Sequence, residues 1–78
     1  MNSRYYINIF CKNVKYLRKK HGLSKAEMAR RLNIGVGSIT LLEKGILPDR
    51  LISAVLLKIE EIFSVQPAVL LSKILEDL

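Results

Sequence analysis

Residues 23–45 constrain the fold of this chain most strongly, because their pattern predicts two short helices joined by a tight turn. Ser24 and Glu27 have the spacing of a capping box, which opens a helix. Apolar residues then recur at helical spacing as far as an Asn-Ile-Gly turn, and a second helical period follows at once and ends at a glycine. Two helices this short cannot bury their apolar faces separately. We therefore expect helices over about 24–32 and 36–44 to pack together as a compact corner.

The remainder of the chain predicts further helices and no strand. The expected elements are an N-terminal arm over residues 1–8, a helix over about 9–20 capped by Asn8, a loop over 46–52 around Pro48, a helix over about 54–63 capped by Ser53, and a helix over about 67–76 that begins at Pro67. Phe10, Val14 and Leu17 share one face of the first helix and are candidates for the core. The sequence thus predicts an all-α fold, a compact five-helix bundle forming one domain over residues 9–78.

Length and composition narrow the class of protein. The chain has 78 residues, of which 50% are hydrophobic, enough for one small core. No apolar run approaches the ~18 residues of a membrane helix, and Arg4 interrupts the N-terminus early, so we expect neither a membrane span nor a signal peptide. The single cysteine, Cys11, excludes an internal disulfide and fits a cytoplasmic protein. It lies on the inner side of the first helix, where an ordinary buried thiol and a reactive thiol are both open interpretations.

Basic residues are concentrated toward the start of the chain. Residues 1–50 hold eleven Lys/Arg and three acidic residues, a balance of +8, whereas residues 51–78 hold two and four, a balance of −2. The predicted helical corner therefore lies in the basic part. This distribution favours a phosphate-binding face, although a solvated basic surface would have the same composition.

The sequence gives no support for catalysis. Cys11 and His21 would lie roughly 15 Å apart on one continuous helix, too far for a nucleophile and its base. No cluster of Cys, His, Asp or Glu has the spacing of metal ligands, and the glycines at 35 and 37 follow no strand, so they do not form a dinucleotide-binding loop. We expect no enzymatic activity, no metal and no cofactor.

Motifs at fixed spacing give the chain a family resemblance. The motifs are Leu17-Arg18, Gly22-Leu23-Ser24, Glu27-Met28-Ala29, Leu32-Asn33-Ile34, Ile39, Leu42-Glu43-Lys44-Gly45, Pro48 and the tail from Ile62 to Pro67. From about Val14 to Leu71 the chain resembles the lambda-repressor-like, Cro/repressor-type (XRE-type) helix-turn-helix family of prokaryotic and phage regulators. The resemblance implies a five-helix domain that binds operator DNA, usually as a symmetric dimer on an inverted repeat.

Matching the family residue by residue implies roles for several side chains. Lys25, Lys44 and Arg50 match positions that contact the DNA backbone, although Lys25 has a surface lysine as its alternative and Arg50 could instead cover apolar surface. Arg18 and Glu43 match a structural pair that ties the first helix to the end of the third. The positions that would face the bases are Val36, Gly37, Ser38, Thr40 and Leu41.

The exposed start of the third helix departs from the family pattern, because members often carry Gln, Arg or Asn there. Aliphatic groups and the threonine methyl can pack on thymine methyls, but they cannot supply the bidentate bonds that distinguish guanine or adenine. Two interpretations follow. The domain recognises DNA sequence with modest, partly shape-based specificity, or it keeps the helix-turn-helix fold but no longer recognises bases.

Two functions from different classes therefore remain. The first is a sequence-specific DNA-binding transcriptional regulator, repressor-like and associated with the cytoplasmic nucleoid, whose partners are double-stranded DNA and a second copy of the chain. The alternative is a protein-interaction or antitoxin-like accessory module on the same fold. The basic first part favours DNA, whereas the apolar third helix favours a protein partner. No sensor domain is recognisable, so we expect no small-molecule effector.

Overall fold

The structure, a computed structural model, describes residues 3–78 and is all-helical over that range. Its elements are α1 (Ser3–Lys20), α2 (Lys25–Leu32), α3 (Val36–Glu43), α4 (Asp49–Phe63), α5 (Pro67–Ser72) and a short 3₁₀ helix, η1 (Leu75–Asp77). The expected all-α fold of five α-helices is confirmed, and α2 and α3 lie within one residue of their predicted bounds. None of the described helices is long and apolar enough to cross a membrane.

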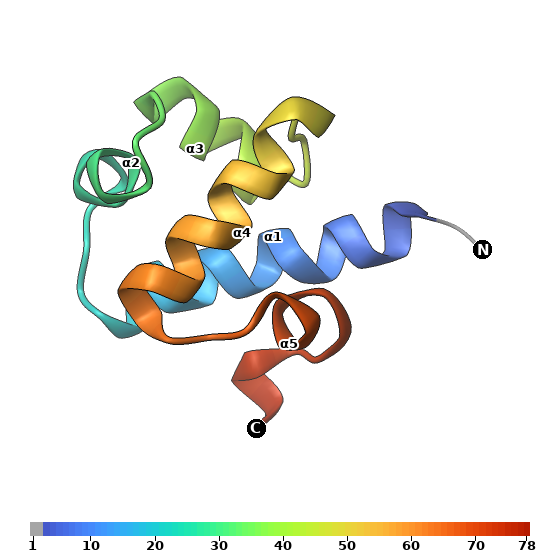
Figure 1. The fold of residues 1–78 in the computed structure, drawn as a ribbon. Helices are drawn as coiled ribbons and strands as arrows, with labels where there is room; N and C mark the ends of the chain where they lie inside the picture. The colour runs from blue at the N-terminus through green and yellow to red at the C-terminus, as the bar shows by residue number, and fades with distance from the viewer. Residues whose placement is uncertain (1–2) are drawn as a thin grey trace.

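Two helices lie at the centre of the molecule. α1 and α4 cross in the middle, with α2 and α3 on one side of them and α5 with η1 on the other (Figure 1). α2 packs against both α3 and α4, while α1 contacts α3, α5 and η1. The α2–α3 corner is therefore held from behind by the two central helices, and its outer surface faces away from the C-terminus.

One core joins all five helices. The three residues predicted on the inner face of α1, Phe10, Val14 and Leu17, are buried. The other buried apolar residues are Ile9, Cys11, Met28, Ala29, Leu32, Ile39, Leu42, Leu47, Val55, Ile59 and Leu70. Because α2 and α3 contribute Met28, Ile39 and Leu42 to the same cluster, their relative orientation is set by packing and not by the turn alone.

The expected arm is wrong over the residues that the structure describes. α1 begins at Ser3 and not at residue 9, so Asn8 lies inside the helix and is not its cap. The physical reason is that the apolar face of the helix continues toward the N-terminus: Ile7, which lies before the predicted start, packs against the core, so extending the helix buries additional surface. Residues 1–2 lie outside the described range.

The last helices also differ from their predicted bounds. α4 begins at Asp49 rather than at 54, because Pro48 acts as its N-cap in an extended conformation and accepts a bond from the Leu51 amide at 2.9 Å. Ser53 is therefore not a cap, and the expected loop over 46–52 is shorter. Pro48 interrupts the apolar pattern because it marks the start of α4, and not because it lies inside a loop. α5 ends at Ser72, four residues before its predicted end.

Asn13 explains where α5 ends. Its side chain is 1% exposed, and its Nδ2 donates to the carbonyls of Leu70 (2.9 Å) and Lys73 (2.7 Å). Its Oδ1 accepts from the amide of Leu75 at 2.9 Å, at the start of η1. One buried amide on α1 thus satisfies backbone groups at the end of α5 and holds the turn into η1.

Cys11 is an ordinary buried thiol in this structure. Its side chain belongs to the core, and desolvation by burial raises its pKa from 9.0 to about 11. A thiol held protonated is a weak nucleophile at neutral pH. This geometry favours the structural interpretation over the reactive one.

Replacing Asn13 with alanine is expected to destabilise the fold by about 3 kcal/mol, because three backbone bonds are lost at about 1 kcal/mol each. The free energy of unfolding from urea titration measures this loss. Asn8→Ala is the matched control, since Asn8 is exposed on the same helix, and its effect should stay within about 0.5 kcal/mol. Equal effects of the two substitutions would contradict the clamp assigned to Asn13.

Candidate nucleic-acid interface

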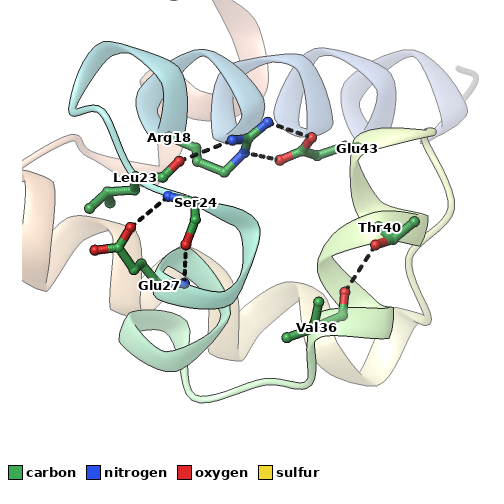
Figure 2. Close-up of polar contacts among 7 residues, drawn as sticks. All are labelled: Arg18, Leu23, Ser24, Glu27, Val36, Thr40 and Glu43. Carbon is green, nitrogen blue, oxygen red and sulfur yellow. Dashed lines mark hydrogen bonds and ion pairs between the residues drawn. The ribbon is translucent and has the colours of Figure 1, made fainter.

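The capping box fixes the start of α2. The Ser24 Oγ accepts a hydrogen bond from the Glu27 amide (3.1 Å), and the Glu27 Oε1 accepts one from the Ser24 amide (2.8 Å; Figure 2). These bonds lower the pKa of the Glu27 carboxyl, with smaller contributions from nearby arginines. The reciprocal bonds occupy two amides at the helix terminus. Neither bond uses the amides of Lys25 and Ala26, the first two residues of α2, and the Lys25 side chain beside them is exposed.

A three-residue turn aims α3 relative to α2. Asn33 adopts the left-handed conformation (φ 59°), its amide donates to the Arg30 carbonyl at 3.2 Å, and the Ile34 amide donates to Ala29 at 2.9 Å. This pair of bonds is a Schellman motif, which reverses the chain directly after a helix. Gly35 then returns to extended backbone and caps α3. The turn length matches a helix-turn-helix.

α3 has one buried side and one exposed side. Ile39 and Leu42 are fully buried, whereas Val36 is 48% exposed and Leu41 44%. Gly37 is exposed, and Ser38 and Thr40 are half-buried. The exposed side therefore carries the aliphatic residues that the sequence places toward DNA.

The hydroxyl of Thr40 is already engaged. Its Oγ1 donates to the carbonyl of Val36 at 3.2 Å, one turn earlier on the same helix (Figure 2). A bond of this type satisfies the hydroxyl proton within the helix. Thr40 therefore presents chiefly its methyl group and an acceptor lone pair.

The end of α3 requires glycine at residue 45. Gly45 has φ 87°, a conformation that L side chains rarely adopt, and a Cβ there would lie 3.4 Å from the Oδ1 of Asn8 on α1. Its amide donates to Leu42, and the next amide, from Ile46, donates to Leu41. The left-handed backbone at Gly45 turns the chain out of α3 and toward α4.

The three cations predicted to contact phosphate come from different elements. Lys25 lies in the first turn of α2, Lys44 directly follows α3, and Arg50 lies in the first turn of α4. All three are exposed, and within residues 3–78 none of them forms an ion pair. The exposure of Arg50 leaves its guanidinium accessible to an anion.

Arg18 and Glu43 form a bidentate ion pair that connects α1 to the end of α3. The Arg18 Nε donates to Glu43 Oε2 at 2.5 Å and its Nη2 to Oε1 at 3.1 Å, while its Nη1 donates to the Leu23 carbonyl at 3.0 Å (Figure 2). The side chains are only 13% and 5% exposed. The guanidinium thus fixes the end of α3 and the approach to α2 together. The carbonyl of Leu23 was not predictable as a partner, because a backbone acceptor leaves no mark in the sequence.

No arrangement for metal chemistry accompanies this surface. Over the part of the chain that the structure describes, no group of three His, Cys, Asp or Glu side chains is placed to hold a metal ion. The surface therefore offers cations, methyl groups and backbone.

Breaking the Arg18–Glu43 pair is expected to destabilise the protein by about 3–5 kcal/mol for either alanine variant, because each leaves a buried charge without its partner. The double variant Arg18→Ala/Glu43→Ala should lose clearly less than the sum of the two single losses. Urea titrations of all four proteins measure the coupling. Strictly additive losses would show that the two side chains do not stabilise each other.

Comparison with known proteins assigns the family. A family model described as helix-turn-helix matches residues 14–70, which include the C-terminal part of α1, all of α2, the turn, α3 and α4, and most of α5. No curated protein and no solved structure matches the chain. The family match covers well over half of the sequence and contains the whole α2–α3 corner. The chain therefore belongs to the XRE-type helix-turn-helix family, a family of DNA-binding regulators.

Proposed function

We propose that this chain is a sequence-specific, repressor-like transcriptional regulator of prokaryotic or phage type that inserts α3 into the major groove of DNA. The observation that carries the proposal is electrostatic. Glu43 is the single acidic residue of α3, and it is buried against Arg18. The exposed side of α3 therefore carries no negative charge. Exposed cations nearby in the sequence include Lys25 on α2, Lys44 directly after α3 and Arg50 on α4.

Phosphate contacts would supply most of the affinity. Lys25, Lys44 and Arg50 are free to neutralise phosphates, and such contacts position a protein on the duplex without reading its sequence. Base reading falls to the exposed residues of α3, which are Val36, Gly37, Ser38, Thr40 and Leu41. The proposed regulator works on the nucleoid in the cytoplasm and requires neither a cofactor nor an effector.

A specific observation favours the alternative function. Val36, Leu41 and Ile46 are 48%, 44% and 51% exposed, so the α3 side of the molecule presents large apolar groups to solvent. Exposed apolar clusters often mark protein–protein contact. A protein-interaction or antitoxin-like module would use these residues against a partner protein, and it would bind duplex DNA weakly or not at all.

Salt dependence distinguishes the two functions. We expect the wild-type protein to bind random-sequence duplex at ~50 mM salt, with affinity falling as salt rises because bound counterions are released. Lys25→Gln should lower the slope of log K against log salt by about 1, equally on every duplex. Lys73→Gln is the matched control, because Lys73 is also exposed and directly follows α5, which lies on the opposite side of α1 from α2 and α3 (Figure 1).

Fluorescence anisotropy on these duplexes measures both quantities. Absence of binding to any duplex at ~50 mM salt would contradict the DNA function. A changed preference at one base pair, with total affinity intact, would contradict the phosphate role of Lys25.

We also propose that two copies bind an inverted repeat, with half-sites one helical turn or about 34 Å apart. The candidate surface is the C-terminal end, where Leu78 is 81% exposed and Val65, Val69 and Ile74 are half-buried. Leu70 of α5 is fully buried in the core and is no part of such a surface.

Leu78→Asp is expected to weaken dimer formation on an inverted-repeat duplex, because it places a charge in the proposed interface. Leu57→Asp on α4 is the control, since Leu57 is 63% exposed and lies outside that surface. Sedimentation with and without the duplex gives the stoichiometry. A wild-type protein that stays monomeric on the duplex, or a Leu78 variant that pairs normally, would remove this interface.

A further inference from the structure

The exposed side of α3 has a specific arrangement around Gly37. At about 100° per residue, Gly37 points opposite the buried Ile39 and Leu42. Val36 and Thr40 lie along one flank of Gly37 and Leu41 lies along the other. A Cβ built on Gly37 would meet nothing within 4 Å, so the middle of this side is open. The result is an apolar helix face, called the α3 site below, on which bare backbone at Gly37 lies between the exposed aliphatic side chains of Val36 and Leu41.

The α3 site has little means of reading hydrogen-bond patterns. α3 contains no Asn, Gln, Arg or Lys, and the Thr40 hydroxyl proton is donated to the carbonyl of Val36. Ser38 lies toward the buried side and is half-buried. Without bidentate donors and acceptors, the helix has no strong way to distinguish base edges by their polar groups.

One feature of the major groove does fit an apolar site. The C5-methyl group of thymine projects into this groove, and 5-methylcytosine carries a methyl group at the same ring position. The two bases differ at C4, where thymine has an oxygen acceptor and cytosine an amino donor. The aliphatic side chains of Val36 and Leu41 carry no donor or acceptor, so they respond to the C5-methyl group and not to this difference at C4.

We propose that the exposed side of α3 recognises pyrimidine C5-methyl groups, accepting thymine and 5-methylcytosine alike and discriminating against uracil and unmethylated cytosine. The proposal rests on the DNA-binding function proposed above. It identifies Val36 and Leu41 as the residues that cover the methyl groups and Gly37 as the position that lets them approach. Binding would then respond to cytosine C5-methylation within the site.

The test begins with the DNA. A duplex enriched by the wild-type protein from a random-sequence library is resynthesised with deoxyuridine in place of each thymidine in turn. At every covered methyl we expect affinity to fall by about fourfold, the value for losing one buried methyl group. Replacing the same A·T pair with G·C should also weaken binding, and 5-methylcytosine at that position should restore most of the loss.

Protein variants assign the effect to α3. Leu41→Asn and Val36→Ser should reduce the thymidine-to-deoxyuridine affinity ratio toward 1, because each removes the methyl groups of its side chain. Leu57→Asn, the same change as Leu41→Asn at an exposed leucine on α4, should leave the ratio unchanged. Gly37→Ala adds a methyl group that touches nothing else in the protein, so the fold should be retained while affinity for the thymidine duplex falls. Thermal melts of each variant verify folding.

The outcomes are separable. Equal affinity for the thymidine and fully deoxyuridine-substituted duplexes would overturn methyl recognition while leaving the DNA function intact. A ratio that both Val36→Ser and Leu41→Asn leave unchanged would also overturn it. Failure to bind any duplex at ~50 mM salt would overturn the proposed function, and methyl recognition with it.

Discussion

The ion pair between Arg18 and Glu43 is the interaction on which the functional part of this structure depends. It joins the central helix α1 to the last residue of α3, and the same guanidinium holds the Leu23 carbonyl just before α2. Both side chains are largely buried, so either charge without the other would be costly. The pair therefore acts as a fixed reference between the α2–α3 corner and the rest of the core.

α1 has a second polar connection on its other side. Asn13 holds the end of α5 and the start of η1 through three hydrogen bonds, while Arg18, further along α1, holds α3. The described residues contain no buried side-chain nitrogen or oxygen without a partner. In a chain of this size the apolar core is small, and polar contacts with fixed geometry add specificity to packing that aliphatic residues alone leave degenerate. The α2–α3 corner and the C-terminal segment of α5 and η1 are thus both positioned by one continuous helix.

In the proposed DNA surface, different groups would supply the affinity for DNA and the specificity for its sequence. Its cations are long, exposed side chains on α2, on α4 and directly after α3, suited to phosphates at several places along a duplex. The exposed side of α3 contributes methyl groups and backbone, whose contacts are weak individually and depend on close approach. The Arg18–Glu43 pair serves both tasks, because it removes the carboxylate of α3 from the surface and fixes the helix that must approach the bases.

The sequence by itself determined the class of fold and the position of the corner. Local signals suffice there: the capping box of Ser24 and Glu27 and the left-handed residue at Asn33 act within a few residues along the chain. The pairing of Arg18 with Glu43 came from family resemblance, since residues 25 apart in sequence have no local pattern that joins them.

Only the tertiary structure decided how the ends of the chain are used. The start of α1 at Ser3 follows from the packing of Ile7 against the core, and the short α5 follows from a buried amide 57 residues earlier in the chain. Asn13 could have been suspected, because it interrupts the apolar face formed by Phe10, Val14 and Leu17. Its partners, however, are backbone groups brought close by packing. Every residue has a backbone carbonyl, whatever its side chain. The sequence therefore does not indicate which carbonyl will accept a hydrogen bond from a distant side chain, and only the packing of the helices brings the two together.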